Sequence, residues 1–364
     1  MAQPATAGAS VFRRLDWRGL LLALAISVAG GLTFNYFDLP LPWMLGAAFF
    51  TTVATLSGVP ATIPQRLRNA MLIVLGVLLG SSFTAEVLHD ADRWLLSLAG
   101  ILLYVVVVGG AVFLLLRRLA GYDAPTAYFA GTPGGLAEMT LIGGAMGGDE
   151  RTIALTHALR IVIIVFVVAF GFQLLAGYVP QQREAQYVLF ADVPAQDLLL
   201  LAACGVLGAL AARWLRLPAG NLLGPMLLSA AVHLTGLSEV PPPTVLVAVA
   251  QLIVGGALGC RFFGVPLMRL LRTAVVALGC SAVMLAGTLA FSAVLSPLAG
   301  LSFAALVLAF APGGLAEMAV IALALGIDVA FVSTHNIVRV LAILMLAPLV
   351  FRLVARRAKR GQQT

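Results

Sequence analysis

Apolar runs long enough to cross a bilayer recur along the whole chain and alternate with short polar segments. A bilayer core requires about 20 consecutive, mostly apolar residues per helix. Segments 20–32, 95–116, 161–176 and 340–350 lie within runs of this kind. The pattern predicts an all-α membrane protein that crosses the bilayer many times.

The composition agrees with this pattern. Hydrophobic residues make up 61% of the 364 residues and charged residues 10%, whereas about a quarter of the residues in a soluble domain are charged. The net charge is +7, but the basic residues are scattered between apolar segments and do not gather on one surface, as nucleic-acid binding requires. We therefore interpret them as topology signals and expect no nucleic-acid partner.

The heptapeptide PGGLAEM occurs twice, at 133–139 and at 312–318. Alignment of the two copies without gaps also superposes Arg160 on Arg339. Further pairs of matching residues, with one residue gained or lost upstream, are Gly46 with Gly224, Gly58 with Gly236, Gly76 with Gly255, Gly80 with Gly259 and Asp149 with Asp328. We predict two homologous repeats that together span nearly the whole chain.

Each repeat is expected to contain six helical segments. They are 18–36, 43–58, 67–83, 94–117, 124–146 and 152–177 in the first repeat, and 197–213, 221–237, 244–261, 271–294, 302–325 and 330–354 in the second. The expected domains are an N-terminal cytoplasmic tail (1–17), a first transmembrane repeat (18–178), a polar, proline-containing linker (179–196), a second transmembrane repeat (197–354) and a basic cytoplasmic tail (355–364). The first apolar run has no obvious cleavage site after it, so we expect a retained helix and not a signal peptide.

Positive charges decide between two orientations of the repeats, because Lys and Arg gather on the cytoplasmic side of a membrane protein. If the segments around PGGLAEM cross the bilayer, the repeats are parallel; if each enters and returns as a hairpin, they are inverted. Without Arg160 and Arg339, which lie within helices, the parallel arrangement places 13 of the remaining 20 Lys and Arg inside. The inverted arrangement places 18 inside and leaves Arg93 and Arg183 outside. We favour inverted repeats, with both termini in the cytoplasm.

The Pro-Gly-Gly triplets at 133–135 and 312–314 lie deep within apolar segments. Proline removes a helix hydrogen bond and glycine permits a positive φ, so we expect the helix to break at both triplets. Broken backbone at membrane depth is tolerated where protein or a water-filled cavity satisfies its polar groups, and secondary transporters use such breaks to bind substrates and ions. A packing kink is the alternative.

Glu138 and Glu317 follow the two triplets and are expected near the N-terminus of the second half-helix. The positive end of the helix dipole stabilises a carboxylate there, and an ionisable residue within the membrane is a candidate functional residue. We assign both glutamates to coupling with a proton or a sodium ion. Capping of the half-helix is the alternative, and the two roles are compatible.

Arg160 and Arg339 follow the glutamates of their repeats at equal distances, each inside an otherwise apolar helix. A guanidinium there costs about 2.5 kcal/mol or more unless it has a partner. Each arginine is expected either to pair with a glutamate as a buried bridge or to bind an anionic group of a substrate. His157 shares the helix face of Arg160, and His335 and Asn336 share that of Arg339. We expect neutral, hydrogen-bonded histidines, with a proton carrier as the alternative.

These considerations define a predicted site. The residues assigned to substrate binding are Thr132, Pro133, Gly134, Gly135, Pro312, Gly313, Gly314, Arg160, Arg339, His157, His335 and Asn336, and those assigned to ion coupling are Glu138 and Glu317. No phosphate-loop, GxSxG or HExxH motif is present, and the three cysteines lie in apolar stretches without CxxC spacing. We expect no enzymatic activity, no cofactor and no metal.

The doubled PGGLAEM, with Arg160 and Arg339 at matching distances, resembles the AbrB-type membrane proteins, a bacterial family with an internal duplication of this kind. The resemblance covers nearly all of the chain. Members have been labelled regulators of gene expression and ammonia monooxygenases, so the resemblance implies the fold more strongly than an activity. A monooxygenase would need clustered His, Asp and Glu ligands around copper or iron, whereas the candidate residues here are isolated among apolar ones.

The observations together predict a secondary transporter in which the two broken segments meet near the midplane. The arginines favour a small anionic solute, and the glutamates handle a proton or sodium ion. Any effect on gene expression would be indirect. A membrane sensor that signals through a partner protein without flux is the alternative. The bilayer, the solute and the ion are the expected partners; the oligomeric state is open, with a homodimer as one candidate.

Overall fold

Helices form every regular element in the residues that the computed structural model describes, which are 16–83, 91–175 and 188–360. Seven of them are long and apolar enough to cross a membrane. They are α1 (Trp17–Tyr36), α5 (Trp94–Arg118), α8 (Glu150–Leu175), α9 (Ala195–Trp214), α11 (Thr244–Gly259) with the 3-10 turn η4 (Cys260–Phe262), α12 (Leu267–Ala299) and α15 (Val329–Arg360). The predicted all-α, multi-pass membrane fold is confirmed. Most of the expected N-terminal tail (1–17) and half of the expected linker (179–196) lie outside the described residues.

The remaining elements are shorter. They are the π-helical turn η1 (Pro42–Gly46), α2 (Ala47–Leu56), α3 (Gln65–Gly80), η2 (Ala91–Arg93), α6 (Ala124–Gly131), α7 (Leu136–Ala145), α10 (Gly220–Leu234), α13 (Phe303–Phe310) and α14 (Leu315–Ala324). The order of helices from α9 to α15 therefore matches the order from α1 to α8. The last helix continues to Arg360, beyond the expected end near 354.

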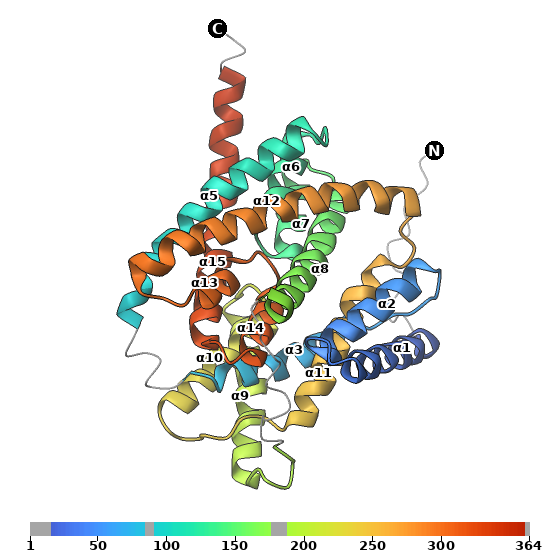
Figure 1. Cartoon of the computed structure of the whole chain (residues 1–364), viewed down its shortest axis with the longest axis vertical. Helices are drawn as coiled ribbons and strands as arrows, with labels where there is room; N and C mark the ends of the chain where they lie inside the picture. The colour runs from blue at the N-terminus through green and yellow to red at the C-terminus, as the bar shows by residue number, and fades with distance from the viewer. Residues whose placement is uncertain (1–15, 84–90, 176–187, 361–364) are drawn as a thin grey trace, which may run out of the picture.

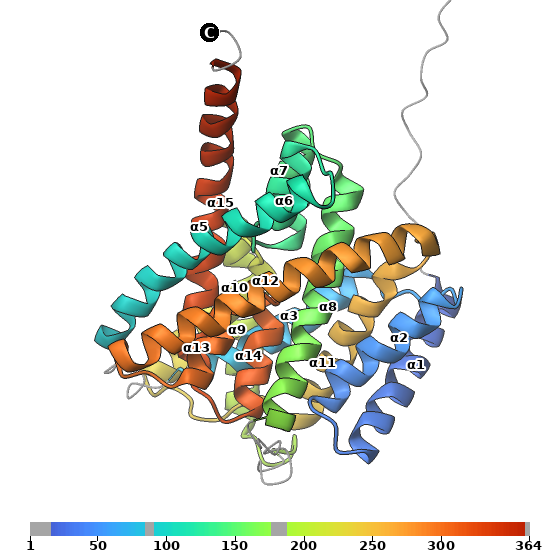
Figure 2. The same cartoon turned by 45° about the horizontal axis from the view of Figure 1, so that its top comes forward.

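The helices pack into two bundles. We call one the glycine-packed bundle, which contains α1, η1, α2, α3, α9, α10, α11 and η4, and the other the hairpin bundle, which contains α5 to α8 and α12 to α15. Figures 1 and 2 show α1, α2 and α11 together on one side, and α5 crossing α12 on the other. The α3 helix contacts α14 and α15. In addition, Phe166 and Phe170 of α8 contact Phe49 and Phe34, so apolar rings form part of the contact between the bundles.

Glycines bring backbones into contact within the glycine-packed bundle. A Cβ atom at Gly30 would overlap the carbonyl group of Gly46, and a Cβ atom at Gly208 would overlap that of Gly224. Small residues permit this close approach of membrane helices. The two contacts are equivalent, because one joins α1 to η1 and the other joins α9 to α10.

Contacts between the two halves are reciprocal. Gly76 on α3 lies against the carbonyl of Leu222 on α10, and Gly255 on α11 lies against the carbonyl of Met44 in η1. In the alignment of the repeats, Gly76 corresponds to Gly255 and Met44 to Leu222, so these are the same contact with the two halves exchanged. A twofold rotation relates two bodies in this manner. The contacts therefore support the predicted duplication.

Equivalent helices of the two halves run antiparallel in the hairpin bundle. Gly100, early in α5, lies against Leu295, late in α12, whereas Leu115, late in α5, lies near Gly279. Figure 1 shows the two helices crossing in this arrangement. Equivalent helices of parallel repeats would run in the same direction, so this pairing supports inversion.

The two halves also share unusual backbone conformations. Leu41 and Ala219 have φ angles of 46° and 47°, and Asp38 and Arg216 have φ angles of 51° and 54°. The members of each pair occupy corresponding positions in the alignment of the repeats. Residues other than glycine seldom adopt a positive φ, so two matched pairs are a further observation in favour of the duplication, which stays a prediction.

Both interrupted helices break at the predicted triplets, since residues 132–135 separate α6 from α7 and residues 311–314 separate α13 from α14. The backbone N–H of Asp149, which follows α7, donates to the hydroxyl of Thr126 in the first turn of α6 over 2.8 Å. The chain therefore leaves α7 close to where it entered α6, and the two helices form a hairpin. α13 and α14 likewise pack on each other.

Candidate functional site

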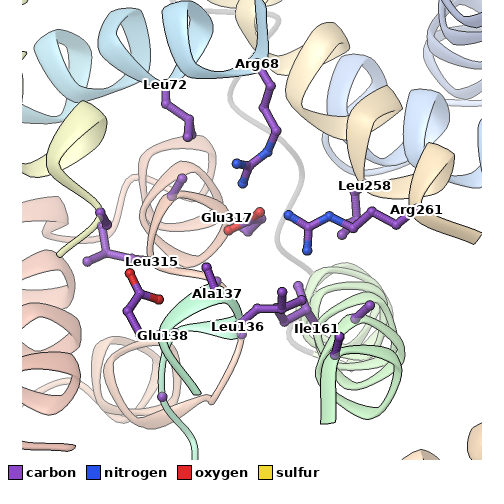
Figure 3. Close-up of a pocket in the computed structure, with 18 of the residues that line it drawn as sticks. Arg68, Leu72, Leu136, Ala137, Glu138, Ile161, Leu258, Arg261, Leu315 and Glu317 are labelled. Carbon is purple, nitrogen blue, oxygen red and sulfur yellow. The ribbon is translucent and has the colours of Figure 1, made fainter. Parts of the chain in front are cut away.

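A cavity of about 1260 Å³ lies between the two bundles. Both hairpin turns line it, through residues 133–138 and 313–317, together with the first turns of α3, α8, α10 and α12. Figure 3 shows Glu138 and Glu317 within this space, on α7 and α14. The two breaks, which lie in different halves of the sequence, thus border one cavity.

The lining of the cavity has an excess of positive charge. Its charged residues are five arginines and two glutamates, namely Arg68, Arg151, Arg261, Arg269, Arg339, Glu138 and Glu317. Gln65, Asn69 and Asn221 add amide groups. Guanidinium groups in a low-dielectric cleft raise the local concentration of anions, so the cavity favours an anionic occupant.

Glycine at the end of each turn makes room for the glutamate that follows it. A Cβ atom at Gly135 would overlap the carboxylate of Glu138, and one at Gly314 would overlap that of Glu317. Each glutamate lies in the first turn of its half-helix, where the helix dipole stabilises a negative charge. The Glu317 side chain is 8% exposed, and Glu138 is half-buried.

Arg339 binds the end of the first half-helix of its hairpin. Its Nη1 donates to the carbonyl oxygens of Phe310 at 3.1 Å and Ala311 at 2.9 Å, and its Nη2 donates to Oδ1 of Asn336 at 2.7 Å. The last carbonyl groups of a helix have no partner within the helix. The guanidinium supplies that partner and places a positive charge at the negative end of the α13 dipole.

Arg160 does the same for the first hairpin. Its Nη1 donates to the carbonyls of Thr132 at 3.2 Å and Ala130 at 3.4 Å, and its Nη2 lies 2.9 Å from Nδ1 of His157. Because Nδ1 accepts from the guanidinium, the other ring nitrogen carries the proton. This Nε2 donates to the carbonyl of Phe129 over 2.8 Å, which makes His157 a neutral, fully bonded link.

The structure gives the buried arginines a kind of partner that the sequence did not suggest. Among the described residues, neither Arg160 nor Arg339 forms an ion pair with Glu138 or Glu317, and both bind main-chain carbonyls. The expected arginine–glutamate bridge therefore does not form here. A guanidinium can still meet a solute, because Arg339 also lines the cavity.

The predicted site residues divide into two groups. Those that line the cavity are Pro133, Gly134, Gly135, Gly313, Gly314, Arg339, Glu138 and Glu317. Those outside the lining are Thr132, Pro312, Arg160, His157, His335 and Asn336. For His335, Nε2 is 2.8 Å from Oγ of Ser97 and Nδ1 is 2.8 Å from the carbonyl of Phe331, so both ring nitrogens have partners. Direct contact of the second group with a solute stays a prediction.

Sequence reasoning missed four of the five lining arginines as site residues and interpreted them as topology signals; they are Arg68, Arg151, Arg261 and Arg269. Figure 3 shows the guanidiniums of Arg68, from α3, and Arg261, from η4, beside Glu317. A signal existed for Arg68, because Gln65, Arg68 and Leu72 follow helical spacing and share a face. No local pattern marks Arg261.

Metal ligands do not gather in the part of the chain that the structure describes. No group of three or more His, Cys, Asp or Glu residues there could hold a metal ion. Cys204 and Cys280 are buried free thiols, and Cys260 is a partly buried one.

Comparison with known proteins assigns a family. Residues 43–355 match the family described as "Transition state regulatory protein AbrB". The "Uncharacterized protein YhjN" of Bacillus subtilis (strain 168) is 28% identical over 357 residues, covering 91% of this chain and 92% of that protein. The "Putative regulator AbrB" of Escherichia coli (strain K12) is 27% identical over 350 residues, covering 95% of this chain and 98% of that protein. Since the family match covers most of its length, this multi-pass membrane protein belongs to the AbrB family.

Proposed function

We propose that the protein is a secondary transporter that carries a small anionic solute across the bacterial inner membrane, coupled to a proton or sodium gradient. The observation that carries this proposal is the cavity bordered by both broken hairpins and by five arginines. Discontinuous helices in transporters direct their positive N-termini at anionic groups near the midplane. Here α7 and α14 begin at the cavity, each directly after its Pro-Gly-Gly turn.

The side to which the cavity opens follows from its basic residues. Arg68, Arg151, Arg261 and Arg269 lie in or next to the end turns of their helices, and the positive-inside rule favours the cytoplasm for such residues. The structure would then correspond to a cytoplasm-facing state, with both chain termini on the same side.

The division into two bundles gives this proposal a route to alternating access. Transporters of inverted repeats expose a fixed site to either side by rocking one bundle against another. The contacts of Phe34 with Phe170 and of Phe49 with Phe166 are apolar and non-directional, so a shift between the bundles breaks few specific bonds there. Because the two halves are arranged reciprocally, an exchange of their conformations would produce the state in which the cavity opens to the outside.

The test is flux through purified protein in liposomes. Uptake of radiolabelled acetate, succinate, citrate and aspartate is measured under an inward proton gradient and under an inward sodium gradient, with protein-free liposomes as the control. Accumulation of at least one compound under one gradient supports the proposal. Uptake equal to that of protein-free liposomes for all four under both gradients contradicts it.

The names of the family and of the relative from Escherichia coli favour a second candidate, a membrane sensor that acts on gene expression through a partner protein. The two candidates differ in one measurable respect. A sensor binds its ligand tightly and retains a cytoplasmic partner through purification, but moves no solute. A transporter changes expression only by altering a metabolite pool, and neither candidate needs a chemical conversion or a cofactor.

A further inference from the structure

The surroundings of Glu317 suggest a more specific role for the cavity. This carboxylate is buried, yet it faces the cavity. Figure 3 shows the guanidiniums of Arg68 and Arg261 close to it, one from each of two elements of the glycine-packed bundle. Among the described residues, no hydrogen bond or ion pair joins Glu317 to either arginine, so the three charged groups converge on open space.

Arg339 supplies an independent observation on the same cavity. Its side chain is 2% exposed, lines the cavity, and has an Nε atom without a hydrogen-bond partner. A buried donor left without a partner costs about 1–3 kcal/mol. The cavity is therefore bordered by a buried guanidinium that the protein leaves only partly satisfied, a state shared by Nε of Arg160 outside the lining.

Charge decides what can occupy the space beside Glu317. When the carboxylate is ionised, it offsets one of the two neighbouring guanidiniums and repels an incoming anion. When it is protonated, Arg68 and Arg261 face the cavity without a counter-charge, and a guanidinium pair binds a carboxylate through paired, charge-assisted hydrogen bonds. Uptake of a proton and binding of an anion therefore favour each other.

A sodium ion is disfavoured at the same place. Sodium requires several oxygen ligands, whereas the groups nearest Glu317 in Figure 3 are two guanidiniums, which repel a cation. The other charged groups of the lining that face the cavity are Glu138 on α7 and Arg339 on α15, with Arg151 and Arg269 on α8 and α12. Every other element that contributes a charged residue to the lining thus contributes an arginine, except α7, which contributes Glu138.

We propose that Arg68, Arg261 and Glu317 form one combined site, in which a small organic carboxylate binds between the two guanidiniums only after Glu317 has taken up a proton. This inference rests on the proposed transport function and names its coupling ion, the proton, and its substrate class, a small carboxylate. One proton and one carboxylate would move together, because each stabilises the other at the site.

The experiment measures binding of radiolabelled acetate, succinate and citrate to purified full-length protein in lipid nanodiscs over a pH series. At least one compound should bind, and its affinity should fall as the pH rises, by up to about tenfold per pH unit if one proton is taken up with each anion. Glu317→Gln, which resembles the protonated form, should bind the same compound with no pH dependence. Glu317→Asp should restore the dependence.

The arginines are tested against a matched control on the same helix. Arg68→Gln and Arg261→Gln should each weaken binding by about tenfold or more, whereas Arg66→Gln, an exposed arginine that does not line the cavity, should not. Folding of each variant is checked by its elution profile. If Glu317→Gln does not fold, Glu317→Ala replaces it, and it should likewise bind without pH dependence.

Three results overturn the inference: no binding of any of the three compounds to the wild type, a pH dependence that persists in Glu317→Gln, or equal losses in the variants at Arg66 and Arg68. A different result contradicts the transport proposal itself, namely that no compound is taken up by the liposomes. Sodium-driven flux of a carboxylate without proton dependence would leave transport standing and remove the combined site.

Discussion

Arg339 and Ala311 are joined by a 2.9 Å hydrogen bond from guanidinium to main-chain carbonyl at the break of the second hairpin. The bond shows that a buried arginine can be retained in a membrane helix to satisfy a helix end, whose last carbonyl groups have no partner within the helix. Arg160 and the carbonyl of Thr132 repeat the relationship at 3.2 Å in the first hairpin.

Removal of this guanidinium should destabilise the fold. We expect Arg339→Ala to lower the free energy of unfolding by at least about 2 kcal/mol, because two carbonyls and the Asn336 amide lose their donor. Arg339→Lys should recover only part of the loss, since one ammonium group cannot reach all three partners. Thermal unfolding in detergent measures the effect, with the exposed Arg352→Ala on the same helix as the control. If Arg339→Ala were as stable as Arg352→Ala, the hydrogen bonds of Arg339 would not stabilise the fold, and its role would be in binding the solute.

The turn before Glu317 should tolerate no side chain. In Gly314→Ala the new methyl group would displace the carboxylate, so we expect a loss of gradient-driven uptake and a loss of about 1–3 kcal/mol in stability from overpacking. Gly110→Ala in α5, where no atom lies within 4 Å of the added carbon, should be neutral or stabilising by up to about 1 kcal/mol. Similar behaviour of the two variants would argue against the turn as part of the site.

The reciprocal contacts predict paired mutational effects. Gly76→Ala and Gly255→Ala each force a methyl group against a main-chain carbonyl of the other half, so both should lower the unfolding temperature, and by similar amounts. Overpacking of this kind costs about 1–3 kcal/mol. Gly171→Ala meets no atom within 4 Å and is the control. A large effect at one of the two positions and none at the other would count against the twofold relationship.

Cysteine labelling in intact and in lysed cells tests the membrane topology. Inverted repeats place Ser302, an exposed residue before α13, outside the cell, whereas parallel repeats place it inside; Ser57 is exposed after α2 and lies inside in both. In a chain without its native cysteines, an impermeant maleimide added to intact cells should label Ser302→Cys and not Ser57→Cys. Labelling of Ser302→Cys only after lysis would restore the parallel arrangement.

Asp149 should make a pH-dependent contribution at the start of α8. Its Oδ2 accepts from the Thr152 hydroxyl at 2.6 Å and its Oδ1 from the N–H of Arg151 at 3.0 Å. The hydroxyl bond is the main cause that holds the pKa of this carboxyl below its ordinary value of 3.8. The stabilisation is therefore fully present above that value and is lost as the pH falls through the lower pKa of the folded state.

We accordingly expect Asp149→Ala to cost about 1 kcal/mol at neutral pH, with the difference from the wild type shrinking in acid below pH 3.8. Chemical unfolding at a series of pH values measures it. Asp123→Ala is the matched control, because Asp123 precedes α6 without a side-chain capping bond. A difference that stays constant into acid would contradict the assignment.

The breaks and the cavity differ in how far the sequence could predict them. Pro133 and Pro312 break their helices through local chemistry, which any sequence window contains, and the following glutamates take the expected place in the next turn. The carbonyl of Ala311 could not be foreseen as the partner of Arg339, because every residue has a carbonyl and none is marked. Likewise, Arg261 meets Glu317 only through the approach of η4 to a hairpin much further along the chain, which depends on tertiary packing.

The exchange of contacts between Gly76 with Leu222 and Gly255 with Met44 has a consequence for biosynthesis. When α3 leaves the ribosome, the helix that covers its glycine face has not yet been made, and η1 waits even longer for α11. The first half must therefore remain in the bilayer, or be held by the insertion machinery, with these close-packing faces uncovered until much of the second half is translated. Neither half expressed alone should close its bundle, whereas the two halves produced together from separate messages should assemble with each other.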